Sequence, residues 1–332
     1  MPASRRAVIL EAILDAIHES GNSAVLLTSS RAHPARFAVV TPEGREFTLA
    51  VYAWTLTPGG RPQLVHEYRV QMTSVESPLP VNPLEVTVLL GYEPNLQTFA
   101  GFDLARHRTF TTGSPSIQVD IRAVQQALQD GLSFSRKTNY EIAVGVRPDQ
   151  LIAYALNAGR FHRYGKEAAT FDLITRASSL ESIPPQEIEA LPTERQRVVQ
   201  AVTRLSRLAN FRQTVLQAYG FRCAITRVQL KLVDAAHILP VGAPGSADDV
   251  RNGLALSPTY HRAYDNGLIY LDENHDMRIN TRRAEELGRM RLAGGIERFR
   301  TPLGRIHLPP DRRQWPNANF ITRANRFRQI PH

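Results

Sequence analysis

Apolar and polar residues follow two different periodicities along the first half of the chain. An apolar stripe with helical spacing runs from about Ser4 to Ser20. Short apolar or alternating runs follow, separated by Pro, Gly, Asn and Asp, which is typical of strands joined by turns. The strand-like runs are AVLLTSS, RFAVV, EFTLAVYAWTL, EYRVQM, EVTVLLGY, TFAGF and YEIAVGV, and two further helical runs are IRAVQQALQDGL and RPDQLIAYALNA. The pattern predicts a mixed α/β domain over residues 1–160.

The periodicity weakens between residues 161 and 192. Three prolines, Pro184, Pro185 and Pro192, fall within nine residues there, and this composition predicts a linker over 161–192. From Thr193 to Gly220 apolar residues recur at helical spacing, which indicates one long helix or two. We therefore expect a second domain over residues 193–332.

Composition excludes several protein classes. The chain has 332 residues and one cysteine, Cys223, so an intramolecular disulfide and a zinc site built from paired cysteines are both excluded. Acidic residues interrupt the apolar stretch near the N-terminus, which argues against a signal peptide. No run approaches the roughly 18 apolar residues of a membrane span. We expect a cytoplasmic protein with no membrane partner.

The net charge of +9 is unevenly distributed. Residues 193–230 and 276–332 carry excesses of 6 and 8 positive charges, whereas residues 231–275 carry an excess of 3 negative charges. Basic flanks attract a polyanion, and the acidic residues between them remain available to bind a cation. All 13 basic residues of the last block are arginine, which makes two-point contacts to phosphate. The distribution favours a nucleic-acid partner, although solvated helix faces also carry such charges.

The candidate chemistry lies within residues 221–272. A short apolar strand, KLVDAAHIL, bears Asp234 and His237, and a turn-rich loop follows it. The segment LALSPTYHRAYDNGL is expected to begin as a strand and to continue as a helix. His261 and Asp265 are spaced i, i+4, which places both side chains on one helix face about 6 Å apart, close enough to bind one divalent cation.

Hydrolysis of a phosphodiester bond requires a base with a pKa near neutrality and a Lewis acid that assists the leaving oxygen. His237 is the candidate base, and His261 with Asp265 is the candidate cation site. Asn252 is expected to join the first strand to the loop and so keep the His237 ring oriented. Each feature alone also fits a structural role. His237 fits a hydrogen-bonded core histidine, Asn252 fits an Asn-Gly turn, and His261 with Asp265 fits a helix-surface pair. Their order and spacing favour a nuclease.

Three blocks of the segment, DAAHILP, RNGLAL and HRAYDNGL, resemble the HNH or ββα-metal nuclease family as it occurs in restriction endonucleases. The resemblance implies that His237 activates water and that Asn252 braces the motif. It also implies that His261 is a metal ligand and that Asp265 supplies a second ligand. The expected fold class is α+β, with an N-terminal mixed α/β recognition domain and a C-terminal ββα-metal nuclease domain.

The segment departs from the family pattern at Ala236, where many members carry a metal-binding Asp or His. Asp234 lies two residues earlier, and it either substitutes as a metal ligand or hydrogen-bonds the loop. Five arginines are expected to contact the DNA backbone: Arg251, Arg262, Arg227, Arg282 and Arg283.

The N-terminal domain is more weakly similar to domains fused to HNH modules in restriction enzymes, some of which are modification-dependent. Its polar and aromatic residues are candidates to hold a flipped modified base or to contact the backbone, with core packing as the alternative for the aromatic ones. The candidates are Tyr68, Tyr92, Phe99, Phe102, His107, Arg108 and Ser116.

These observations predict a metal-dependent DNA endonuclease of restriction type, directed to methylated or otherwise modified DNA. The expected cofactor is one divalent ion, Mg²⁺, with Mn²⁺ or another divalent ion as alternatives. The expected partner is double-stranded DNA, and a homodimer is expected because each site nicks one strand. The alternative is a non-catalytic DNA-binding protein or modified-base reader with a degenerate nuclease fold.

Overall fold

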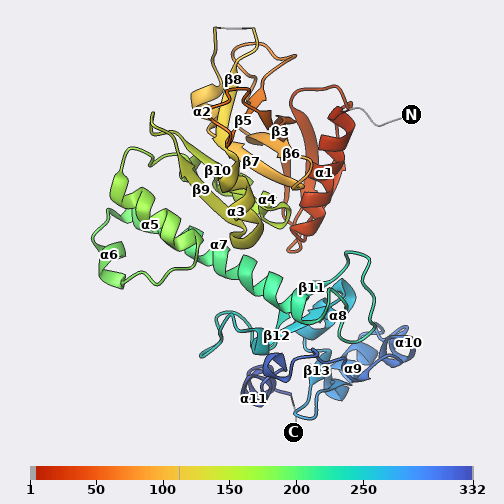
Figure 1. The fold of residues 1–332 in the computed structure, drawn as a ribbon. Coiled ribbons are helices and arrows are strands. Elements are labelled where there is room, and N and C mark those ends of the chain that lie inside the picture. The colour runs from red at the N-terminus through yellow and green to blue at the C-terminus, as the bar shows by residue number, and fades with distance from the viewer. Residues whose placement is uncertain (1–4, 112, 331–332) are drawn as a thin grey trace. The chain divides into compact units, whose positions relative to one another are not determined.

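A seven-stranded mixed sheet forms the centre of the N-terminal part of the chain (Figure 1). The structure is a computed structural model that describes residues 5–111 and 113–330. The chain divides into an N-terminal unit, Met1–Ala209, and a C-terminal unit, Asn210–His332. The strand order is β1-β2-β3-β6-β7-β10-β9. These strands are β1 (Ser23–Leu26), β2 (Ala35–Val40), β3 (Glu46–Thr55), β6 (Val86–Glu93), β7 (Thr98–Phe102), β10 (Ile142–Val146) and β9 (Leu132–Arg136).

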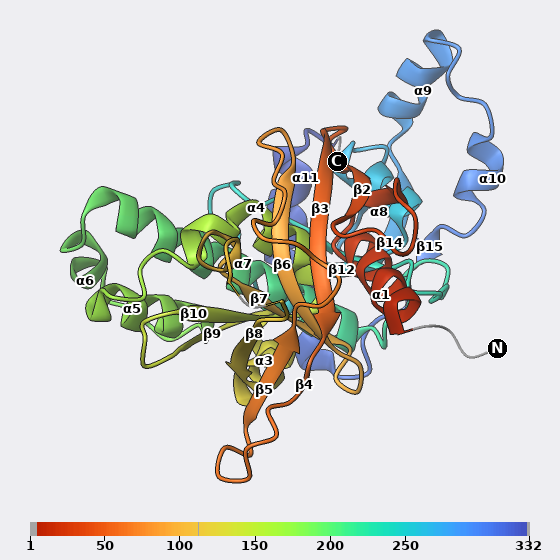
Figure 2. The same cartoon turned by 90° about the horizontal axis from the view of Figure 1, so that it is seen from above.

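Strands β3 and β6 are paired in parallel, and all other neighbours in this sheet are antiparallel (Figure 2). The chain between β3 and β6 contributes to a second, three-stranded sheet of order β4-β5-β8. Its strands are β4 (Thr57–Pro58), β5 (Glu67–Gln71) and β8 (Ser116–Asp120). The central strands of the large sheet are buried on both faces, which explains their nearly continuous apolar sequences.

Helices and the small sheet cover the two faces of the large sheet. Alternate residues of β3 point to opposite faces, so that Leu49 and Val51 pack in one core cluster while Tyr52 and Trp54 pack in another. Buried side chains of α1, α4, α5 and α7 also pack in the first cluster, and buried side chains of α3 and the small sheet pack in the second. The helices of this part are α1 (Arg5–Glu19), α2 (Leu104–His107), α3 (Ile121–Asp130), α4 (Leu151–Phe161), α5 (Ala168–Ser178), α6 (Pro185–Glu189) and α7 (Thr193–Ala218).

The structure confirms the predicted helices and strands of the first half, although Ser4 lies outside the described residues. It differs from the predicted linker over 161–192. That segment forms α5 and α6, and Leu173 and Ile174 of α5 are buried in the core of the N-terminal unit. The unit extends to Ala209 because apolar residues of α7, including Val199 and Val202, complete the same core. The boundaries at 160 and 193 are therefore corrected to one boundary after Ala209.

The C-terminal unit is built around a short hairpin and a helix. The hairpin pairs β11 (Asp234–His237) with β12 (Gly253–Leu256), and α8 (Pro258–Asp265) follows directly. This is the predicted ββα order. The remaining elements are β13 (Ile269–Leu271), β14 (Asp276–Ile279), α9 (Thr281–Arg289), α10 (Ile296–Arg300), β15 (Gly304–Arg305) and α11 (Ala318–Phe327).

Among the described residues, no helix is long and apolar enough to cross a membrane.

Candidate active site

The hairpin and the helix of the C-terminal unit bring the predicted site residues together. Antiparallel pairing places Asp234 opposite Leu256 and His237 opposite Gly253. Gly253 has a packing role, because a Cβ atom there would lie 2.2 Å from Cγ2 of Val215 on α7. Pro258 occupies the first turn of α8 and fixes where the helix begins.

The His237 ring is held on one face and at one edge. It stacks on Phe211, with ring centroids 3.7 Å apart and planes 11° apart. Its Nε2 atom lies 2.9 Å from Oδ1 of Asp248 in the loop between the two strands. Because a carboxylate only accepts a hydrogen bond, Nε2 carries the proton and Nδ1 retains its lone pair. The ring is thus oriented with one nitrogen available as a base.

Burial and charge act on the His237 ring in opposite directions. Burial lowers the pKa of His237, and it outweighs the hydrogen bond and negative charge of Asp248, which raise that pKa. The negative charge of Asp265 also raises the pKa of His237, and the charge of His261 lowers it. With a lowered pKa, the imidazole is neutral at neutral pH, as a general base must be.

His261 lies between two carboxylates. Its Nδ1 atom is 3.6 Å from Oδ2 of Asp234, and its Nε2 atom is 3.3 Å from Oδ2 of Asp265. Burial lowers the pKa of His261, but the two carboxylates outweigh it and hold the pKa above its usual value. The site therefore has a negative potential that favours a cation.

The donor set fits a divalent cation at one edge of His261. An imidazole binds a metal through one nitrogen while the other nitrogen is oriented by a carboxylate. Nε2 of His261 and the Asp265 carboxylate form an edge that could hold a metal ion, and Asp234 lies at the opposite nitrogen. Among the described residues, no three His, Cys, Asp or Glu side chains already converge as a complete metal site. Further ligands would come from water and a phosphate oxygen, as is usual for Mg²⁺.

Asn252 is fully buried and joins two parts of the site loop. Its Oδ1 accepts a hydrogen bond of 2.8 Å from the backbone N–H of Leu239, and its Nδ2 donates to Ala247 O at 2.9 Å. Nδ2 also lies within hydrogen-bond distance of Leu239 O and Ser246 Oγ. The side chain therefore fixes the loop that carries Asp248 against the end of the strand that carries His237.

Residues 223–272 match a family model described as HNH endonuclease. The matched residues include both strands, α8 and every polar residue of the site described above. The C-terminal unit contains an HNH endonuclease domain. The chain is therefore a nuclease, and the predicted ββα-metal fold of this part is confirmed.

Two further comparisons include the N-terminal unit. Residues 47–155 match a family model described as Methylase-associated X1. A solved structure described as modification dependent TagI restriction endonuclease is similar over 85% of this chain and 82% of that chain, with 14% sequence identity and a TM-score of 0.30. No curated protein matches the chain.

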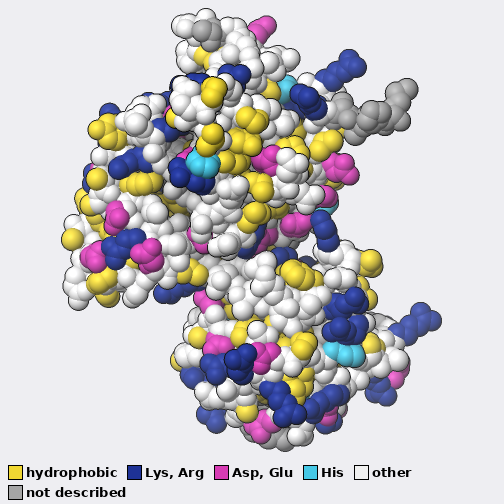
Figure 3. Space-filling model, in the orientation of Figure 1, with side chains coloured by type: hydrophobic (Ala, Val, Ile, Leu, Met, Phe, Trp, Pro, Cys, Tyr) yellow, Lys and Arg dark blue, Asp and Glu magenta, His cyan; other side chains and the backbone are white. Residues whose placement is uncertain are grey.

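The arginines predicted to contact DNA differ in their surroundings. Arg251 is paired with Asp249, and both Arg282 and Arg283 are paired with Glu286. The remaining two, Arg227 and Arg262, are exposed and have no ion pair with any described residue. Many Lys and Arg side chains cover the visible face of the C-terminal unit (Figure 3). The HNH domain thus carries exposed guanidinium groups, Arg227 and Arg262, that no carboxylate among the described residues neutralises.

Most aromatic candidates of the N-terminal unit belong to its core. Tyr92, Phe99 and Phe102 are at most 5% exposed, so stacking on a flipped base is excluded for their present positions. His107 is hydrogen-bonded to buried Glu141. Arg108 donates to the backbone oxygen of Leu79, and Ser116 and half-buried Tyr68 lie in the small sheet. Alternation along short apolar strands places such aromatics in the core.

Sequence reasoning missed two residues of the HNH site, Asp248 and Phe211. Asp248 belongs to an acidic pair in the site loop, and that pair was the available signal. A loop has no periodicity, so the sequence does not reveal which acidic residue faces His237. Phe211 belongs to the predicted apolar seam of α7, and only the packing of that helix places it on the His237 ring.

Proposed function

We propose that this protein is a metal-dependent DNA endonuclease of restriction type, in which the HNH domain cuts and the N-terminal unit directs cutting to methylated or otherwise modified DNA. The observation that carries the proposal is the pairing of an oriented, neutral His237 with the cation-binding edge formed by His261 and Asp265. A base and a cation site are the two elements that phosphodiester hydrolysis requires.

In this mechanism, His237 removes the proton from the attacking water through Nδ1. Asp248 accepts the Nε2–H hydrogen bond and stabilises the positive charge that the ring acquires. Phe211 fixes the plane of the ring by stacking. His261 and Asp265 would hold the divalent ion, which supplies charge stabilisation at the phosphate and the leaving oxygen when it is bound. Mg²⁺ is the proposed ion, with Mn²⁺ as a substitute.

Asp234 is proposed to act on His261 instead of binding the ion directly. Its carboxylate lies at Nδ1, and an imidazole whose Nδ1–H faces a carboxylate presents Nε2 to a metal. Asn252 supports the base from the other side, because it fixes the loop of Asp248. Arg262 and Arg227 are proposed to contact backbone phosphates, since neither charge is neutralised within the described residues.

The assignment of recognition to the N-terminal unit has two supports. The unit is separate from the HNH domain and has its own core, so it is available for a different task. Residues 47–155 of this unit also match a family model described as Methylase-associated X1, and association with a methylase is consistent with a role that depends on modification. Cutting of both strands needs two sites, so we propose that the enzyme acts as a homodimer.

Digestion of a panel of plasmids tests this function. Unmodified, cytosine-methylated and adenine-methylated plasmids are incubated with the full chain and Mg²⁺, Mn²⁺ or a chelator. We expect cutting that needs a divalent ion and is faster on at least one modified plasmid. Equal cutting of all plasmids would contradict the role of modification. Binding without cutting under every condition would instead support a non-catalytic reader.

A further inference from the structure

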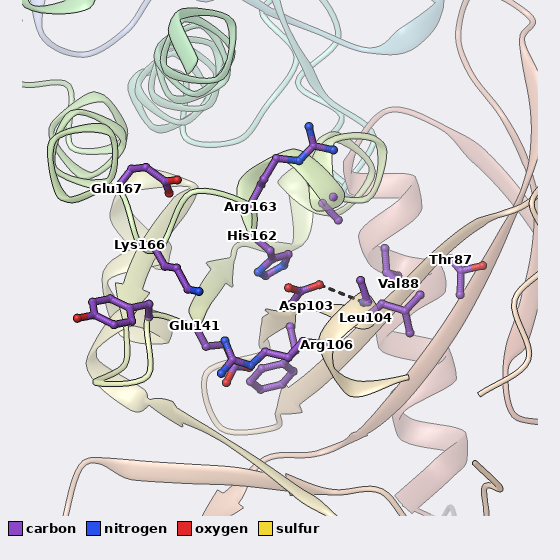
Figure 4. Close-up of a pocket in the computed structure, with 16 residues that line it drawn as sticks. Thr87, Val88, Asp103, Leu104, Arg106, Glu141, His162, Arg163, Lys166 and Glu167 are labelled. Atoms are coloured by element: carbon purple, nitrogen blue, oxygen red, sulfur yellow. Dashed lines mark hydrogen bonds between the residues drawn. The ribbon is translucent and has the colours of Figure 1, made fainter. Parts of the chain in front are cut away.

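A cavity of about 590 Å³ lies entirely within the N-terminal unit (Figure 4). Its walls come from β6, the start of α2, the turn before β10, the end of α4 and the segment that leads into α5. The HNH site does not use any of these elements. Cavities of roughly 300–1,000 Å³ are the size that binds small molecules.

Two polar groups that line the cavity already have partners. The carboxylate of Glu141 is bound by His107 and by Lys137, whose Nζ lies 2.9 Å away. The buried ring of His162 is held between the Tyr154 hydroxyl at 2.9 Å and the backbone oxygen of Ile142 at 2.8 Å. Both ring nitrogens of His162 are therefore occupied. Glu141 and His162 stabilise the cavity wall and have little capacity left for a ligand.

Three other lining groups have at least one charged or polar atom without a partner among the described residues. Lys166 makes no ion pair or hydrogen bond with any described residue. Asp103 accepts one hydrogen bond, from the backbone N–H of Ala105, and no cation among the described residues is paired with it. Glu167 is paired through Oε1 with Nη2 of Arg195 at 3.6 Å, but its Oε2 is buried without a hydrogen-bond partner, and it is the one carboxylate oxygen in that state within residues 5–111 and 113–330. Such an orphaned acceptor indicates that a donor is missing.

These groups define the chemistry of a ligand. Figure 4 shows the Lys166 ammonium and the Asp103 carboxylate turned toward the same space, beside the His162 ring. A fitting ligand carries N–H donors for the carboxylates and an anionic group for the ammonium. Val88, Leu104 and other apolar residues of the lining can contact a flat ring.

We infer that this cavity binds one nucleotide whose base carries an amino group. The exocyclic amine would donate to a carboxylate, the ring would lie against the apolar wall, and the phosphate would contact Lys166. The nucleotide comes either from a base extruded from duplex DNA or from a free nucleotide. The first source rests on the proposed function, because it requires DNA as the substrate.

The test measures both sources on the full chain. Calorimetry follows the binding of dCMP, dAMP and dTMP, of which only dTMP lacks an amino group. Fluorescence of 2-aminopurine in a duplex, with a chelator present to prevent cutting, follows extrusion of a base. The variants are Asp103→Asn, which keeps an acceptor for Ala105 N–H, and Lys166→Met. Matched controls are exposed residues of the same unit, Asp15→Asn and Arg45→Met.

We expect dCMP or dAMP to bind at least about tenfold more tightly than dTMP, because a hydrogen bond to a charged group has roughly that effect. Asp103→Asn should abolish this preference, and Lys166→Met should weaken the binding of all three nucleotides. A fluorescence increase in the duplex, lost in both variants, identifies extruded DNA as the source. Binding of free nucleotides without that increase identifies a free nucleotide.

Failure of this inference differs from failure of the proposed function. Wild-type protein that binds no nucleotide and extrudes no base, or variants that behave like their controls, would overturn the inference. Metal-dependent cutting of DNA by the same preparations would still support the nuclease assignment. Nucleotide binding by a protein that never cuts DNA would contradict the proposed function and leave the cavity assignment intact. Thermal melting of each variant checks that the N-terminal unit is folded.

Discussion

Replacement of Asn252 by alanine should destabilise the C-terminal unit and leave the N-terminal unit unchanged. The side chain is fully buried and accepts the N–H of Leu239 at 2.8 Å. Alanine leaves that buried donor unpaired, which costs about 1–3 kcal/mol. Loss of the bond to Ala247 O, 2.9 Å long, and a small cavity add about 1 kcal/mol. The free energy of unfolding of the C-terminal unit should therefore fall by about 2–4 kcal/mol.

The two tryptophans provide an assay for each unit. Trp54 is buried in the N-terminal unit, and Trp315 lies in the C-terminal unit with its indole N–H bonded to Pro309 O. In a Trp54→Phe background, urea unfolding followed by Trp315 fluorescence reports on the C-terminal unit alone. With a slope of roughly 2 kcal/mol per M urea, the midpoint for Asn252→Ala should fall by about 1–2 M.

Asn319→Ala is the matched control, because Asn319 is exposed on α11 of the same unit. Its midpoint should change by less than about 0.3 M, as for most surface substitutions. In a Trp315→Phe background, Asn252→Ala should leave the Trp54 transition unchanged. An unshifted Trp315 transition in Asn252→Ala would refute the reasoning that this side chain braces the loop.

Three further predictions concern charged groups. Asp248→Ala should reduce kcat at least about tenfold and shift the acidic limb of the kcat/KM profile to lower pH, because Asp248 raises the pKa of His237. Burial raises the pKa of Glu141, but its cationic neighbours outweigh burial and hold that pKa at about 2, below the usual 4.5. The resulting contribution to the free energy of unfolding, on the order of 3 kcal/mol, is present above about pH 4.5 and is lost as the pH falls toward 2. Unfolding followed by Trp54 fluorescence should show this acid-dependent loss of stability in wild type but not in Glu141→Gln. Asp265→Asn should weaken Mn²⁺ binding about tenfold or more, as measured by electron paramagnetic resonance.

Each of these predictions has a control or a contradicting result. An unchanged acidic limb in Asp248→Ala would show that this carboxylate does not act on His237. Glu11→Gln, on the exposed face of α1, should keep the acid-dependent stability of wild type. Glu285→Gln, exposed on α9, should bind Mn²⁺ as tightly as wild type. Equal Mn²⁺ affinity in Asp265→Asn would place the ion elsewhere.

The ββα arrangement could be predicted because its information is local. His261 and Asp265 lie on one helix, where their spacing alone places them on one face, and the structure puts the two side chains 3.3 Å apart. Asn252 precedes β12 directly, and its brace joins residues only 13 positions apart or fewer. Such short-range relations follow from helix and strand geometry.

Long-range packing could not be predicted in the same way. The prolines near residue 184 indicate an irregular segment, yet Pro185 occupies the first turn of α6, where proline is tolerated. The apolar residues of α5 show that the segment packs, but the sequence does not identify the core that receives them. Phe211 is a further case, because its stacking on His237 depends on how α7 lies against the hairpin.

Cutting and binding by His237→Ala test the central claim most directly. DNA binding is measured in a chelator, and cutting is measured with Mg²⁺ on the substrate that wild type prefers. The account predicts that the cutting rate falls by about 10²–10⁴-fold, the usual contribution of a general base, while Kd changes by less than about threefold. Cutting at the wild-type rate with normal binding would contradict the claim that His237 activates the water.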